Sequence, residues 1–107
     1  MRTFEEYQTA VTRTPLSLRN NRDRINLPVL GLQEEAGKVG SLLGSAFGSG
    51  KLALTQAQAS ELHDRLSDML WYVALICGET GVAMQDVAEH SLAQLHARTK
   101  ALDPDQR

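Results

Sequence analysis

Apolar residues recur at helical spacing along most of this chain, and they predict four helices with almost no strand signal. A capping box formed by Thr3 and Glu6 opens the first helix, which we expect to run to about Thr12. The polar segment 15–24 has no apolar period, so we expect it to cross between helices as a loop.

Two further helices carry the longest apolar patterns. The second is expected to begin at Asn26, with Pro28 in its first turn, and to end in the glycine-rich segment 44–50. The third begins with a capping box formed by Thr55 and Gln58. Its apolar positions fall on one helical stripe: Leu62, Leu66, Met69, Leu70, Val73, Ile76 and Cys77.

The last helix follows a short connection. Gly81 has the position of a C′ residue at the end of the third helix, and the fourth helix is expected to start near Met84. Its inward residues are expected to be Val87, Leu92 and Leu95. Short connections favour antiparallel neighbours, so we predict an all-α, four-helix bundle. We assign one domain to residues 1–102 and expect a disordered tail over 103–107.

Composition narrows the possible partners and compartment. At 107 residues the chain is near the small end of the range in which a core is stable alone, so we expect burial against a partner subunit. A net charge of -2 with scattered cations argues against binding DNA or RNA polymers. No apolar run is long enough for a membrane span, and acids stand where a signal peptide would be apolar. We therefore expect a cytoplasmic protein, with the single Cys77 packed in its core.

Acidic clusters on the second and third helices are the main candidate chemistry. Glu35 and Lys38 are neighbours on one helix, with Glu34 rotated by about 100° from Glu35. On the other helix, one face carries Glu61, Asp64, Arg65 and Asp68. Carboxylates arranged in this way suit a hard divalent cation such as Mg²⁺. A solvated helix face is the simpler interpretation of the spacing alone.

A resemblance to a known family favours a functional site over a solvated helix face. The segments LGLQEEAGKV (30–39) and LSDMLWYVA (66–74) closely resemble the MazG-like all-α nucleoside triphosphate pyrophosphohydrolases, which carry an EExGE motif and an ELGD-LWYLA motif on successive helices. The likeness extends to FEEYQ (4–8) and VAE (87–89). It implies a MazG-like bundle completed by oligomerisation, as a homodimer or homotetramer. It also implies cleavage of a nucleoside triphosphate to monophosphate and pyrophosphate, with Mg²⁺ or Mn²⁺ held by four carboxylates.

The resemblance also reveals a departure at the metal site. The family's ligand positions fall on Glu35, Lys38, Arg65 and Asp68, so two of the four are cations that cannot coordinate a metal. Glu35 and Asp68 remain as the catalytic and metal-binding acids that the resemblance implies, while Lys38 and Arg65 become candidates for binding substrate phosphates. The last helix is also altered, because the family's Asn and KLRxR-like stretch are represented here by Ser91, Gln94, Leu95, His96 and Arg98.

Three outcomes are compatible with this altered site. The four positions sum to zero charge, so Glu35 could pair with Lys38 and Arg65 with Asp68 without a metal, as in a pseudoenzyme. Alternatively, Glu61 and Asp64 could join Glu35 and Asp68 to hold Mg²⁺ at a displaced position. In the third outcome Lys38 and Arg65 grip substrate phosphates directly.

Other features of the sequence are weaker indicators of function. Trp71 could stack on a nucleotide base, although a tryptophan in a long apolar helix is more often core or interface. Segment 45–52 resembles a phosphate-binding loop but lacks its first glycine, its final Ser or Thr and a preceding strand. The alternative from another functional class is that the chain is a small helical interaction module with no catalytic activity. Such a module should tolerate neutral substitutions at Glu35 and Asp68.

Overall fold

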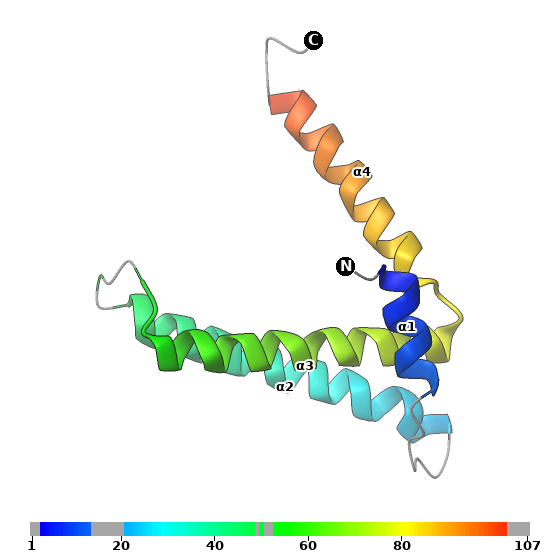
Figure 1. Cartoon of the computed structure of the whole chain (residues 1–107), viewed down its shortest axis with the longest axis horizontal. Helices are drawn as coiled ribbons and strands as arrows, with labels where there is room; N and C mark the ends of the chain where they lie inside the picture. The colour runs from blue at the N-terminus through cyan, green and yellow to red at the C-terminus, as the bar shows by residue number, and fades with distance from the viewer. Residues whose placement is uncertain (1–2, 14–20, 49, 51–52, 103–107) are drawn as a thin grey trace.

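A helical hairpin with two helices at one end makes up this protein. The computed structural model describes residues 3–13, 21–48, 50 and 53–102. Over these residues the chain forms four helices and no strand: α1 (Phe4–Arg13), α2 (Asn21–Phe47), α3 (Gln56–Thr80) and α4 (Met84–Leu102). The predicted all-α class is confirmed for this part of the chain. α2 and α3 lie side by side and antiparallel, α1 crosses one end of the pair, and α4 leads away from that end (Figure 1).

The predicted caps of α1 and α3 are present. The Thr3 hydroxyl accepts from the Glu6 amide at 3.1 Å, and the Thr3 amide donates back to the Glu6 carboxylate at 3.2 Å. Thr55 and Gln58 make the same reciprocal pair at the start of α3, at 3.1 and 2.9 Å. Gly81 has φ 73° and ends α3 in the left-handed region, which a residue without a Cβ enters at no steric cost.

The second helix begins earlier than predicted. α2 starts at Asn21, so Asn26 does not cap it, Pro28 lies in its interior, and residues 21–24 are helical rather than loop. Proline inside a helix removes one backbone hydrogen bond. Here its side chain is fully buried, so packing offsets that loss. At the other end the helix continues through Gly44 to Phe47, because the amide of Gly48 still donates to the Gly44 carbonyl at 2.8 Å.

A small core lies where α1, α3 and α4 meet. Its buried members are Val11, Ala74, Cys77 and Met84. Cys77 is therefore in the core, as predicted, and is free of any disulfide. Partly buried side chains pack around this cluster: Phe4, Tyr7, Trp71, Val73 and Leu75.

Two glutamines tie α1 to the start of α4. The Gln8 side-chain amide donates to the Val82 carbonyl at 2.9 Å, and its oxygen accepts from the Met84 amide at 2.8 Å. The Gln85 side-chain oxygen accepts from the Glu5 amide at 3.4 Å. Ala83 has no side-chain oxygen for the role of N-cap, so Gln8 provides the acceptor that the first amide of α4 needs.

The prediction that the apolar residues of α4 point inward is wrong for the single chain. Val87, Leu92 and Leu95 are 46%, 52% and 55% exposed. After its first turns α4 extends away from the hairpin (Figure 1), so one chain does not close a four-helix bundle. Within the described residues, none of the helices has the length and apolar character needed to cross a membrane. The predicted tail, 103–107, lies outside the described residues.

Candidate functional site

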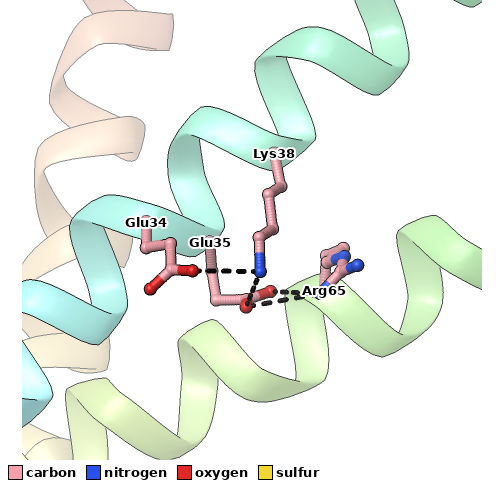
Figure 2. A network of polar contacts seen from close by, with 4 residues as sticks. All are labelled: Glu34, Glu35, Lys38 and Arg65. Carbon is pink, nitrogen blue, oxygen red and sulfur yellow. Dashed lines mark hydrogen bonds and ion pairs between the residues drawn. The ribbon is translucent and has the colours of Figure 1, made fainter.

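The central contact of the site joins α2 to α3. Glu35 lies on the side of α2 that faces α3, and the Arg65 side chain approaches it from α3 (Figure 2). One Arg65 guanidinium nitrogen, Nη1, lies 3.4 Å from both carboxylate oxygens of Glu35. Thirty positions separate the two residues, so this ion pair depends on the packing of the two helices.

Lys38 adds a second cation on the same carboxylate. Its Nζ atom lies 3.6 Å from Glu35 Oε1 and 3.2 Å from Glu34 Oε1 (Figure 2). Both acids lie within a helical turn of Lys38, at spacings that bring side chains together. The resulting charged cluster, which we call the Glu35 cluster, consists of Glu34, Glu35, Lys38 and Arg65. Its charges balance, because it holds two carboxylates and two cations.

Burial differs strongly within the Glu35 cluster. The Glu35 side chain is 9% exposed, that of Arg65 is 30% exposed and that of Lys38 is 43% exposed. A carboxylate taken out of water needs charged or hydrogen-bonding partners to offset its lost hydration. Lys38 and Arg65 supply them, so the cations above Glu35 take the place of the water or metal that would otherwise balance its charge.

The two ion pairs expected within single helices have different outcomes. The Glu35–Lys38 pair is confirmed at 3.6 Å. The Arg65–Asp68 pair is wrong, because the Arg65 guanidinium turns across to Glu35. The physical reason is burial: Asp68 is exposed and solvated, whereas the nearly buried Glu35 gains more from a cation.

Two shallow depressions flank Arg65 on one side of the hairpin. One, of about 630 Å³, runs along α3 and is lined by Ala57, Ser60, Glu61, Asp64, Arg65, Ser67 and Asp68. The other has a similar volume and lies between α2 and α3, lined by Glu34, Gly37, Lys38, Ser41, Leu42, Glu61 and Arg65. The predicted shared face of the α3 acids is therefore confirmed, and Arg65 and Glu61 border both depressions.

The four acids proposed as metal ligands do not gather at one position in the structure. Glu61, Asp64 and Asp68 line the depression on α3, while Glu35 is beneath the two cations and lines neither depression. In the part of the chain that the structure describes, no three His, Cys, Asp or Glu side chains gather where they could hold one metal ion. This arrangement does not fit Mg²⁺ at Glu35, and a metal-binding role for these four acids stays a prediction.

Two residues that were expected to contact a nucleotide, Trp71 and Arg98, lie apart from the depressions. Trp71 packs against the core and against Tyr72, with ring centroids 5.2 Å apart. Arg98 is exposed on α4, which leads away from the hairpin. Sequence reasoning missed the hydroxyls that line the depressions, those of Ser41, Ser60 and Ser67. Their signal is helical spacing, since Ser60 and Ser67 share the face of the α3 acids.

Comparison with known proteins adds no relative. No family model, no curated protein and no solved structure matches this chain.

Proposed function

We propose that this chain is a MazG-like helical protein that binds a nucleoside triphosphate or a related small nucleotide through Lys38 and Arg65. In this proposal the Mg²⁺-dependent cleavage to monophosphate and pyrophosphate is weak or lost. The observation that supports it is the pairing of the nearly buried Glu35 with both cations, at 3.4 and 3.6 Å. Two cations held at the position of the family's metal ligands present charge to an anion rather than oxygen to a metal.

The chemistry of phosphate recognition follows from the two cation types. A guanidinium offers several N–H donors in a plane and can bind two phosphate oxygens at once, whereas an ammonium acts as a point charge. Glu35 holds both groups in place before a ligand arrives, which reduces the entropy lost on binding. Lys38 and Arg65 both border the depression between α2 and α3, where Ser41 can donate a further hydrogen bond. We therefore expect the affinity to follow the charge of the phosphate chain.

The first experiment tests turnover and binding together. Purified protein is incubated with canonical and modified nucleoside triphosphates in Mg²⁺, in Mn²⁺ and in chelator, while monophosphate and pyrophosphate are quantified and binding is followed by calorimetry. We expect binding that survives the chelator and little metal-dependent product. Robust metal-dependent turnover would overturn the proposal and mean that Glu61, Asp64 or another group has rebuilt a metal site.

Variants test the contribution of Arg65 to binding and the effect of restoring acids at both altered positions. Arg65→Met should weaken triphosphate binding by about 10-fold or more, because a charge-assisted hydrogen bond is worth about 1.5–3 kcal/mol. The matched control is Arg24→Met, an exposed arginine on the same hairpin, which should leave the affinity unchanged. The double variant Lys38→Glu with Arg65→Glu restores four acids at the family positions. If that variant gains no Mg²⁺-dependent activity, ligand loss is not the only defect.

An inactive helical interaction module is the second candidate. The observation that favours it is the exposure of large apolar side chains on three helices, among them Leu30, Leu66 and Leu92 at 59%, 49% and 52%. The discriminating variants are Glu35→Gln and Asp68→Asn. An interaction module keeps its function in both, while a nucleotide-binding protein should lose affinity in Glu35→Gln, since Lys38 and Arg65 are then no longer held in place.

A further inference from the structure

Two contacts between α2 and α3 share one face of each helix. The Tyr72 ring lies against Gly31, and Arg65 pairs with Glu35. Gly31 and Glu35 are four residues apart on α2, and Arg65 and Tyr72 are seven apart on α3. Residues at these spacings lie on the same side of a helix. The packing contact and the ion pair therefore belong to one strip of the interface between the two helices.

The Tyr72 ring occupies the space that a side chain at position 31 would need. A Cβ on Gly31 would lie 2.6 Å from Cε1 and 2.8 Å from Cε2 of the ring, and closer still to Cζ. Carbon atoms in contact are normally about 3.5–4.0 Å apart. The ring also contacts Trp71, which packs against the core, and this contact restricts its movement. Glycine at position 31 is thus what allows the two helices to approach this closely.

The ion pair between Glu35 and Arg65 depends on this close approach. Arg65 Nη1 lies 3.4 Å from both Glu35 oxygens (Figure 2), which is beyond the usual hydrogen-bond limit of about 3.2 Å. Separating the helices by about 1 Å would take the pair past the ion-pair limit of about 4 Å. Lys38 and Glu35 are on the same helix, so the distance between them does not change when α2 and α3 separate.

We propose that Gly31 and Tyr72 are positioning residues for the phosphate-binding cation Arg65. The Tyr72 ring on Gly31 sets the helix separation at which Glu35 reaches Arg65, and Glu35 then holds the guanidinium beside the depression between α2 and α3. Gly31 and Tyr72 line neither depression, so they act through Arg65 without touching the ligand. This inference rests on the proposed nucleotide binding, which it deepens.

The first test is a binding cycle with inorganic tripolyphosphate in chelator, followed by calorimetry on variants that circular dichroism shows to be folded. Gly31→Ala should lower the affinity about 5-fold, less than the loss of a whole charge-assisted bond. In the Arg65→Met background it should lower the affinity less than about twofold, because the positioned group is absent, whereas in Lys38→Met it keeps its full effect. The matched control, Gly40→Ala, should leave the affinity unchanged. Equal losses in the wild-type and Arg65→Met backgrounds would overturn the proposal.

A rescue variant separates positioning from general damage to the fold. Leucine lacks the Cζ and Cε atoms that a Cβ at position 31 would meet, so Tyr72→Leu makes room for Gly31→Ala while nearly conserving volume. The double variant should bind tripolyphosphate within about twofold of the wild type. A double variant that binds no better than Gly31→Ala alone would overturn the proposal.

A second cycle measures the ion pair without any ligand. Chemical denaturation of the wild type, Glu35→Leu, Arg65→Met and their double variant gives the coupling between Glu35 and Arg65. The same cycle in the Gly31→Ala background should give less than about half of that coupling. Unchanged coupling would overturn the positioning role even if tripolyphosphate binds. If the wild type binds no phosphate chain, the nucleotide-binding proposal fails, and this cycle still decides whether Gly31 positions Arg65.

Discussion

At the scale of single residues, the two cations Lys38 and Arg65 determine the surroundings of Glu35. A carboxylate at position 65 would add negative charge beside Glu35 and call for a metal. Arg65 instead places a guanidinium across the helix interface, and Lys38 adds an ammonium from the same helix. Glu35 then becomes part of the packing between α2 and α3 as well as a candidate site residue.

Removing one partner from this ion pair should cost more than removing both. Arg65→Met leaves Glu35 nearly buried with Lys38 alone, and we expect it to lower the free energy of unfolding by about 1–3 kcal/mol. Adding Glu35→Leu to that variant removes the stranded charge and should recover most of the loss. Chemical denaturation of the wild type, the two single variants and the double variant measures this cycle. Equal or additive losses in all variants would contradict a coupled pair.

Gly31 permits close packing between the hairpin helices. A Cβ at this position would overlap the Tyr72 ring, whereas a Cβ at Gly40 on the same helix would meet nothing within 4 Å. Gly31→Ala should therefore destabilise the protein by about 1–3 kcal/mol through overpacking. Gly40→Ala, the matched control, should stabilise it by about 0.5–1 kcal/mol because alanine favours the helix. Thermal unfolding of the two variants should show shifts of opposite sign.

At the scale of elements, local caps decide where α1 and α3 begin, and tertiary contacts decide how α4 is oriented. The two capping boxes involve residues three apart, so each forms within its own helix. The start of α4 depends on Gln8, a residue 76 positions away. The junction of α1, α3 and α4 is thus held by a small apolar core and by side-chain caps between helices.

Gln8→Ala should weaken this junction. The variant leaves the Met84 amide, at the nearly buried start of α4, without its acceptor, and we expect a loss of about 1–2 kcal/mol. Hydrogen exchange at that amide should accelerate, while exchange in the middle of the α2–α3 hairpin should change much less. Thr9→Ala is the control, because the Thr9 hydroxyl bonds only within α1. Unchanged exchange at Met84 in Gln8→Ala would show that the clamp contributes little.

At the scale of the whole molecule, the single chain is open. Its core has few buried members, and its dimensions of 50 × 40 × 26 Å are those of an extended arrangement. Small domains bury a limited share of their surface, so a partner that covers apolar area adds directly to stability.

Thermal stability should therefore depend on protein concentration. Self-association, which the family resemblance implies, would stabilise the folded chain by mass action, so we expect the wild-type Tm to rise over a hundredfold increase in concentration. The variant that combines Leu92→Glu and Leu95→Glu should have a lower Tm that does not change with concentration. Scanning calorimetry at several concentrations measures both. A wild-type Tm independent of concentration would contradict a dimer that assembles on folding.

The sequence by itself determined the features that depend on neighbours within a few residues. The all-α class, the capping boxes at Thr3 and Thr55 and the left-handed Gly81 all follow from local hydrogen bonding and steric preference. The common face of the α3 acids follows from helical spacing alone.

Only the tertiary structure decided the features that depend on contacts between helices. Arg65 pairs with Glu35 and not with Asp68 because Glu35 is the carboxylate that is buried. The early start of α2 places Pro28 inside the helix, and the burial of Pro28 against its neighbours offsets the lost hydrogen bond. Helical spacing shows that Leu92 and Leu95 share an apolar face, but it does not show what covers that face. A sequence pattern determines which side of a helix is apolar, whereas burial depends on the element or the chain that lies against it.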